Sequence, residues 1–221
     1  MLKIAIAEDQ ALVRKSMALL IARETDMQVV AEAGDGRELL AQLEKIRADI
    51  VLLDVQMPLL DGFETARQLR VARPELRILM LSLRDDIAAL RKAIDAGANG
   101  YFTKNAPPEE LIQALRRVGR EGFYLEQNLS RLMDIIVPGK ALDERRPMPY
   151  ITPREKEVIC LSAMGLAGKE VADRLFISLR TVERHKANLM ERAGSSNFIG
   201  VIIYALTRGL IEPSDLFPEN G

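Results

Sequence analysis

Five polar side chains in the first half of the chain have the types that phosphoryl-transfer chemistry uses. Each follows a short apolar run, and in chain order they are Glu8, Asp9, Asp54, Ser82 and Lys104. Three converging carboxylates repel one another unless a cation lies among them, and Mg²⁺ is a divalent ion that prefers oxygen ligands and retains water. A carboxylate nucleophile, a metal, an ammonium and a hydroxyl together suit phosphoryl transfer to an aspartate. The pattern therefore predicts a Mg²⁺-dependent phosphoacceptor site.

Each of these residues also has an ordinary structural interpretation. Asp9 and Ser82 are suitable helix N-caps, and Lys104 would fit a solvated loop. Taken singly, each residue is ambiguous. The occurrence of all five after apolar runs, in this order, is difficult to explain by capping and favours phosphoryl transfer.

The positions of these residues depend on a predicted sheet. Apolar runs predict five strands, Leu2–Ala7, Gln28–Ala33, Asp49–Leu53, Arg77–Ser82 and Asn99–Phe102. Helical periodicity predicts helices near 10–24, 35–47, 61–73, 85–97 and 107–121. Five βα units in a row predict an α/β fold, a doubly wound five-stranded parallel sheet of flavodoxin-like type with helices on both faces. With the strand order 2-1-3-4-5, the first and third strands are neighbours and bring their carboxylates together.

The chain of 221 residues is long enough for two domains. The βα pattern covers 1–121, and 122–137 has the periodicity of a short amphipathic helix. Prolines and a Pro-Gly pair then interrupt the periodicity, so 122–149 is predicted to be a linker. From 150 to 221 the sequence predicts helices alone, near 153–165, 168–175, 178–193 and 197–208.

The composition points to a cytoplasmic protein. The one cysteine, Cys160, cannot form an intramolecular disulfide and suits a reducing compartment. No apolar stretch approaches the roughly 18 residues that cross a bilayer, and the first residues lack the layout of a signal peptide. We therefore expect no membrane partner.

The predicted helices after residue 150 have helix-turn-helix spacing. Thr152-Pro-Arg-Glu155 has the composition of a capping box, with proline at the first helical position. A tight turn at Phe176-Ile177-Ser178 joins the next two helices, and the second helix of such a pair enters a major groove of DNA.

DNA binding has to be inferred from where charges lie, because 148–221 carry equal numbers of basic and acidic residues. On the predicted second helix Arg184 suits guanine, Glu183 suits cytosine N4 and Ala187 suits a thymine methyl group. Lys169 and Lys186 are placed for phosphates. The alternative is an ordinary solvated helix face. The full set of predicted DNA-binding residues is Lys169, Arg180, Thr181, Glu183, Arg184, Lys186, Ala187 and Asn188.

Residues 1–121 resemble the receiver domain of two-component response regulators. The matching motifs are Glu8-Asp9, Leu53-Asp54-Val-Gln-Met57-Pro58, Asp61-Gly62, Ser82, Ala96-Gly97-Ala98, Gly100-Tyr101 and Lys104-Asn-Ala-Pro107. The resemblance implies that a sensor histidine kinase phosphorylates Asp54. It implies Mg²⁺ binding by Glu8, Asp9, Asp54 and the backbone carbonyl of Gln56. It also implies that Lys104 pairs with the phosphoryl group, and that Ser82 and Tyr101 act as the switch residues.

One residue departs from the receiver pattern. Receivers usually have a small residue directly after the switch hydroxyl, and this chain has Leu83. A bulky side chain beside the phosphoryl pocket is predicted to slow phosphoryl exchange.

Residues 150–210 resemble the LuxR-type helix-turn-helix. The matching residues are Thr152-Pro-Arg-Glu155, Gly165, Lys169-Glu170-Val171-Ala172, Leu175, Ser178, Thr181-Val182, His185, Asn188-Leu189 and Ala193-Gly194. The departures are Ala167-Gly168, where Ser-Asn is frequent, and Glu183, where a basic residue is common. Together with the receiver this is the layout of the NarL/FixJ subfamily. It implies a non-enzymatic transcription regulator with double-stranded promoter DNA as a partner and RNA polymerase as a further candidate.

A homodimer is expected to be the form that binds DNA specifically. One short helix on a neutral domain offers few contacts, so two copies on an inverted repeat are needed for tight binding. We expect the contacts to come from a receiver face exposed on phosphorylation and from the last helix, whose apolar stripe consists of Phe198, Val201, Ile202 and Ala205.

Three other functions were weighed. A hydrolase of the haloacid dehalogenase type needs a second acid two residues after its nucleophile, and Gln56 occupies that position. A ligand-sensing LuxR-type regulator needs an aromatic-lined apolar pocket, whereas 1–121 contain no Trp. A receiver fold without phosphate control is supported by Leu83 alone.

Overall fold

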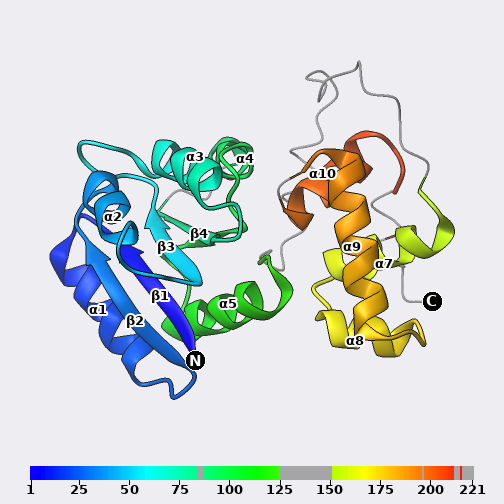
Figure 1. Ribbon diagram of the computed structural model, residues 1–221, viewed down its shortest axis with the longest axis horizontal. Helices are drawn as coiled ribbons and strands as arrows, with labels where there is room; N and C mark the ends of the chain where they lie inside the picture. The colour runs from blue at the N-terminus through cyan, green and yellow to red at the C-terminus, as the bar shows by residue number, and fades with distance from the viewer. Residues whose placement is uncertain (84–86, 125–150, 196, 212–214, 216–221) are drawn as a thin grey trace. The chain divides into compact units, whose positions relative to one another are not determined.

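The chain forms two compact units, Met1–Tyr124 and Leu125–Gly221. The structure, a computed structural model, describes residues 1–83, 87–124, 151–195, 197–211 and 215 (Figure 1). Most of the predicted 122–137 helix and the linker after it lie outside these residues. The described part of that segment is not helical, because Gly122 ends the preceding helix in a left-handed conformation (φ 82°) and Tyr124 pairs with Gly100.

The first unit contains the predicted five-stranded parallel sheet, in the order β2-β1-β3-β4-β5. The strands are β1 (Leu2–Ala7), β2 (Met27–Ala33), β3 (Ile50–Asp54), β4 (Arg77–Ser82) and β5 (Gly100–Thr103). The helices are α1 (Ala11–Ala22), α2 (Gly36–Leu43), α3 (Gly62–Ala72), α4 (Ile87–Asp95) and α5 (Pro108–Glu121). The predicted fold class and strand order are confirmed, and β3 ends one residue later than predicted, on Asp54 itself.

Alternating side chains of the strands supply two apolar layers, one on each face of the sheet. In β1, Ala5 and Ala7 belong to the cluster formed with α2, α3 and α4, whereas Ile4 and Ile6 belong to the cluster formed with α1 and α5. Figure 1 shows the corresponding helices on the two sides of the sheet. Because both faces are covered, the central strands β3 and β4 are buried and nearly continuously apolar, whereas the edge strand β2 is partly exposed. The polar residues that follow them are therefore confined to the strand ends.

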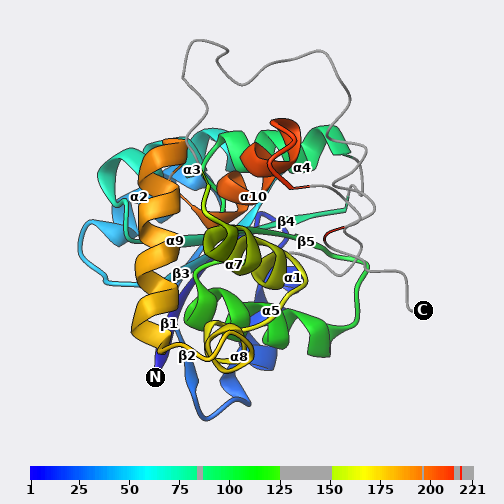
Figure 2. The same ribbon diagram turned by 90° about the vertical axis from the view of Figure 1, so that its right-hand side faces the viewer.

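The second unit is helical over the residues that the structure describes. Its helices are α7 (Pro153–Ala163), α8 (Gly168–Arg174), α9 (Leu179–Ala193) and α10 (Phe198–Thr207). In Figure 2, α8 lies beside the start of α9 and α10 beside its end. The turn between α8 and α9 is the predicted tight turn, and the side chain of Ser178 caps α9 by accepting from the Thr181 N–H at 3.1 Å. No helix among the described residues is long and apolar enough to cross a membrane.

The carboxylate of Glu155 joins the start of α7 to the end of α9. Thr152 and Glu155 form the predicted capping box, and Arg192 donates to Glu155 Oε1 at 2.5 Å. Burial alone would raise the pKa of Glu155, but hydrogen bonds from Arg192 and from the Thr152 N–H and hydroxyl outweigh it, so the pKa is lowered. The carboxylate therefore stabilises the folded domain at pH values above the ordinary glutamate pKa, and this contribution is lost as the pH falls through the lowered pKa.

Replacing Glu155 by glutamine is expected to lower the free energy of unfolding of this domain at neutral pH. The loss should be about 2 kcal/mol, because a buried charged acceptor with several donors is removed. Thermal unfolding of the full chain at a series of falling pH values measures it, since the difference between the two proteins should shrink as the wild-type carboxyl becomes protonated. A difference that stays the same at every pH at which the wild type still folds would contradict the role given to the charge.

Candidate functional site

Three carboxylates converge at the carboxyl ends of β1 and β3. The two strands are hydrogen-bonded neighbours, with Ala7 opposite Leu53, so Glu8 and Asp9 lie beside Asp54. One oxygen from each carboxylate lies within 4.8 Å of the others. Glu8 and Asp54 are buried and Asp9 is exposed. The site is therefore closed on the protein side and open to solvent on the side of Asp9.

Lys104 brings a positive charge into this cluster. Its Nζ lies 2.6 Å from Glu8 Oε2 and 2.9 Å from Asp54 Oδ2. Its backbone N–H donates to the Ser82 carbonyl at 2.8 Å, which fixes the loop after β5 against the end of β4. The structure thus brings together four of the five residues that the sequence selected, and places the fifth, Ser82, at the end of the adjacent strand.

The electrostatics of the cluster favour binding of a further cation. Burial raises the pKa of Asp54, and burial together with the neighbouring Asp54 charge raises the pKa of Glu8, although Lys104 opposes both effects. Burial alone would lower the pKa of Lys104, but its hydrogen bonds to Glu8 and Asp54 outweigh this and raise it. One ammonium thus does not fully offset the cost of burying two carboxylates.

The donor set fits Mg²⁺. Three carboxylates with oxygens this close, two of them buried, are hard ligands that leave room for water on the exposed side. Glu8, Asp9 and Asp54 would hold the ion. The backbone N–H of Gln56 stabilises the charged form of Asp54, and the Gln56 carbonyl remains a predicted fourth protein ligand.

The loop from Asp54 to α3 is held by a close backbone approach. A Cβ at Gly62 would lie 2.1 Å from the Asp54 carbonyl oxygen, so no other residue fits there without a shift of backbone. The Gly62 N–H donates to the Val55 carbonyl at 3.0 Å, and Asp61 caps α3 by accepting from the Glu64 N–H at 2.8 Å. These contacts fix where β3 ends and therefore where the Asp54 carboxylate projects.

The two predicted switch residues are buried, at neighbouring strands. Ser82 ends β4, and Tyr101 on β5 belongs to the apolar cluster on the α2, α3 and α4 face of the sheet. Leu83, directly after Ser82, is 56% exposed. Its side chain is therefore largely in solvent, directly after the end of β4.

Replacing Leu83 by alanine is expected to accelerate both labelling by acetyl phosphate and loss of the label. The side chain obstructs the donor and the hydrolytic water, and a misplacement of about 1 Å at a reacting centre costs up to about 100-fold. Intact mass measured over time in the presence of Mg²⁺ gives both rates. Rates equal to those of the wild type would show that Leu83 does not shield the site.

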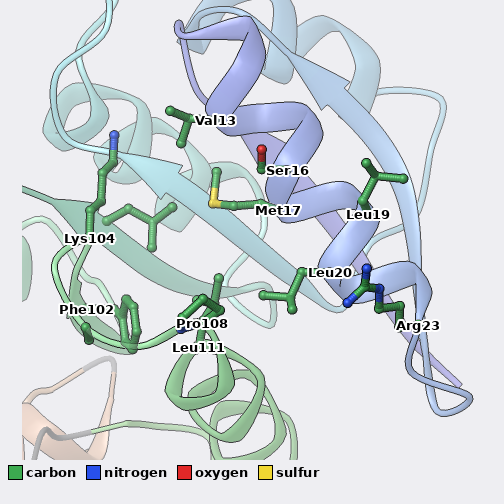
Figure 3. A pocket seen from close by; sticks show the side chains of 12 residues that line it. Val13, Ser16, Met17, Leu19, Leu20, Arg23, Phe102, Lys104, Pro108 and Leu111 are labelled. Atoms are coloured by element: carbon green, nitrogen blue, oxygen red, sulfur yellow. The ribbon is translucent and has the colours of Figure 1, made fainter.

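An apolar groove of about 400 Å³ lies next to this site, between α1 and the region around β5 and α5 (Figure 3). Figure 3 shows Met17 and Leu20 of α1 facing Phe102 and Leu111 across it, with Lys104 at one end. None of the three acidic residues lines the groove. The groove therefore adjoins the carboxylate site at Lys104 but does not include its acidic residues.

Most of the predicted DNA-binding side chains share one exposed surface. On α9 and at the start of α8, the exposed members are Lys169, Arg180, Glu183, Arg184, Ala187 and Asn188. Thr181 is half-buried, because its hydroxyl lies 2.8 Å from that of Ser178 in the cap of α9. Six of the eight predicted DNA-binding residues are therefore exposed.

Lys186 is the member that the structure places elsewhere. It is 2% exposed, and its Nζ lies 5.3 Å from the centroid of the Phe198 ring of α10. This burial contradicts the predicted phosphate contact. The sequence spacing indicates this burial. Lys186 lies four residues after Val182 and three before Leu189, so it continues the buried stripe of α9.

Glu183 turns back toward α8. A Cβ at Gly168 would lie 2.9 Å from Glu183 Oε1. The two departures from the LuxR-type pattern, at Gly168 and at Glu183, are therefore neighbours in space. The absence of a side chain at Gly168 makes room for the Glu183 carboxylate. To make the predicted contact with cytosine, this carboxylate would have to move away from Gly168.

The apolar stripe of α10 is also placed differently from the prediction. Phe198, Val201, Ile202 and Ala205 are all buried within the second unit. The four helices need the whole stripe for their own core, because α10 packs against both α7 and α9. These four side chains are not available as a dimer surface, which corrects that part of the sequence-based interpretation.

Known protein families match both the unit that contains the acidic site and the helical unit. The family model of the response regulator receiver domain matches residues 4–116, and that of the luxR family of bacterial regulatory proteins matches residues 149–205. Oxygen regulatory protein NreC of Staphylococcus aureus is 34% identical over 216 residues, which cover 96% of this chain and 100% of NreC.

Two solved structures are similar in both sequence and fold. A LuxR-family two-component response regulator from an Aurantimonas species is 31% identical, with a TM-score of 0.57 and coverage of 60% of this chain and 96% of that chain. The response regulator RcsB, solved in complex with DNA, is 26% identical, with a TM-score of 0.56 and coverage of 93% of this chain and 98% of that chain.

Proposed function

Because the chain belongs to the two-component response regulators that join a receiver domain to a LuxR-type helix-turn-helix, we propose that Asp54 is its phosphoacceptor and that α9 is its DNA-recognition helix. The observation that carries the first assignment is the buried Asp54 carboxylate, 2.9 Å from Lys104 Nζ and beside Glu8 and Asp9. The observation that carries the second is the exposed face of α9 with Arg180 and Arg184.

In the proposed reaction, an Asp54 carboxylate oxygen attacks the phosphorus of a phosphohistidine on the sensor kinase. The new O–P bond forms as the N–P bond breaks, and the departing imidazole takes a proton. When bound, Mg²⁺ neutralises phosphoryl oxygens at the open side of the site. Lys104 supplies a second cation from the protein side, and the contacts at Gly62 hold the Asp54 carboxylate in place. The site thus has a positioned nucleophile and two sources of positive charge.

Phosphorylation changes the charge that Lys104 and Ser82 face. Lys104 now bridges Glu8 and Asp54, and a phosphoryl group on Asp54 would draw its ammonium away from Glu8. Ser82 at the end of β4 would donate its hydroxyl to a phosphoryl oxygen, and Tyr101 on the adjacent strand would follow it. We propose that this movement alters the receiver surface and thereby the DNA binding of the second domain.

The proposed ligand of the second domain is double-stranded promoter DNA, bound by a homodimer. The exposed Arg180 and Arg184 of α9 are suited to guanine edges and phosphates, and Lys169 at the start of α8 to phosphates. RNA polymerase is a further proposed partner, and the cytoplasm is the proposed compartment. We propose no separate enzymatic activity, since Gln56 occupies the position where an aspartate-based phosphatase carries its second acid.

Replacing Arg184 by alanine is expected to weaken binding to a DNA duplex selected by the wild-type protein. Loss of a bidentate base contact costs about 1–3 kcal/mol, or about 5- to 150-fold in affinity. Fluorescence anisotropy of a labelled duplex measures it. The matched control is Arg67→Ala, which removes an exposed arginine of the receiver helix α3. Equal affinities for Arg184→Ala and the control would refute the assignment of α9.

A further inference from the structure

Phe176, in the turn between α8 and α9, is exposed and backbone-strained at the same time. Its side chain is 95% exposed, and its φ of 53° lies in the left-handed region that bulky residues rarely adopt. Both properties are unfavourable for a phenylalanine in an isolated domain. A residue of this kind therefore needs an explanation beyond folding.

The backbone conformation itself is required by the turn. The Ile177 N–H donates to the Ala172 carbonyl at 3.0 Å, and the Phe176 N–H donates to the Asp173 carbonyl at 3.2 Å. This pair of hydrogen bonds is the Schellman motif that ends α8, in which glycine or asparagine usually takes the left-handed position. The turn explains the backbone of Phe176, but it does not explain the aromatic ring.

The ring lies next to the start of the proposed recognition helix. Ser178, two residues later, caps α9, and the first residues of a recognition helix contact base edges in the major groove. Leu175 is buried and Ile177 half-buried, so Phe176 is the apolar residue of this turn that faces solvent. A side chain in the turn before the helix therefore lies at the edge of the groove that the helix enters.

The charges around the ring favour DNA over a protein surface. The exposed Arg174 ends α8 two residues before Phe176, and the exposed Arg180 lies in the first turn of α9. Residues 173–180 thus carry two exposed basic side chains against one exposed acid, Asp173, and an aromatic ring between basic residues in the sequence suits the apolar sugar and methyl groups of DNA beside its phosphates.

We infer that Phe176 is a DNA-contact residue whose ring packs on deoxyribose or on a thymine methyl group at the edge of the major groove. The inference deepens the proposed function and rests on α9 being the recognition helix. The strain at Phe176 is then retained because the ring is used in the complex.

The test replaces Phe176 by asparagine, which tolerates the left-handed conformation and removes the ring. In anisotropy titrations of the phosphorylated full chain on a duplex selected by the wild type, Phe176→Asn should bind about 10-fold more weakly, because apolar contact area is lost. Its thermal stability should not fall, and the dependence of affinity on salt should keep its slope, since no phosphate contact changes. Phe176→Tyr, which keeps the ring, should bind like the wild type.

The matched control is Leu59→Asn. Leu59 is also exposed, at 71%, and left-handed, with φ 64°, but lies in the receiver domain. With phosphorylation verified by mass, this variant should bind like the wild type. A duplex with deoxyuridine in place of thymine separates the two contacts, because it weakens the wild type more than Phe176→Asn if the ring meets a methyl group, and affects both proteins equally if the ring meets deoxyribose.

Arg184→Ala distinguishes the inference from the proposed function. If Arg184→Ala binds weakly while Phe176→Asn binds like the wild type, the role of Phe176 is overturned and that of α9 stands. If neither substitution weakens binding, both assignments fall. A Phe176→Asn protein that loses stability but keeps its affinity would make the ring a structural element and overturn the inference.

Discussion

Replacing Asp54 by asparagine is expected to abolish phosphorylation of the chain. The amide cannot act as the nucleophile toward phosphorus, whereas Glu8 is fully buried and Asp9 is exposed without a positioned cation among the described residues. After treatment with acetyl phosphate and Mg²⁺, the wild-type mass should rise by one phosphoryl group and the mass of Asp54→Asn should not change. Chelation of Mg²⁺ should abolish labelling of the wild type as well.

The control for this experiment is Asp61→Asn. Asp61 lies in the same loop and caps α3, and asparagine is an equally good cap, so this variant should fold and be labelled like the wild type. Labelling of Asp54→Asn to the wild-type extent would assign the phosphoryl group to another residue and would overturn the proposed role of the buried cluster.

Removing one half of an inverted-repeat site is expected to lower affinity for the phosphorylated protein by about 10²–10⁴-fold, because a second linked contact multiplies the affinity of the first by that factor. The exposed face of one α9 offers too few base contacts for tight binding on its own. Anisotropy titrations on duplexes with two half-sites and with one half-site scrambled measure the difference.

Spacing provides the control for the dimer. Inserting about 5 base pairs between the half-sites turns them to opposite faces of the duplex and should lower the affinity as much as scrambling one half-site does. Inserting about 10 base pairs returns both half-sites to the same face and should lower the affinity less. Equal affinities for one and two half-sites would show that a monomer suffices. A charge introduced into α10 cannot serve here, because Val201 lies in the core of the domain and its substitution would disrupt folding.

The sheet and the acidic site were predictable because both follow from local patterns and one topological rule. Continuous apolar strands with helices between them require a doubly wound sheet, and in that sheet the residues after β1 and β3 must meet. The predicted convergence of Glu8, Asp9 and Asp54 is therefore confirmed. The position of Lys104 after β5 placed it near these carboxylates, and the structure adds its ion pairs with both Glu8 and Asp54.

The helical domain was less predictable, because burial there depends on which helix packs on which. The spacing of Lys186 continues the buried stripe of α9, but its charge favoured an exposed position in the prediction, and the sequence of α9 does not reveal that α10 covers this position. The apolar stripe of α10 was ambiguous for the same reason. Its apolar residues fit a dimer interface or a domain core equally well, and only the packing of α10 against α7 and α9 shows that they form the core. The contact between Glu183 and Gly168 depends on the angle between α8 and α9, which spacing does not specify.

The measurement that tests the account most directly is the affinity of the full chain for a selected duplex before and after phosphorylation, with Asp54→Asn measured beside the wild type. Phosphorylated wild type should bind more tightly than the unphosphorylated protein, and Asp54→Asn should give the same affinity with and without acetyl phosphate. A wild-type protein that carries the phosphoryl group, as shown by its mass, yet binds DNA with unchanged affinity would contradict control of DNA binding through Asp54.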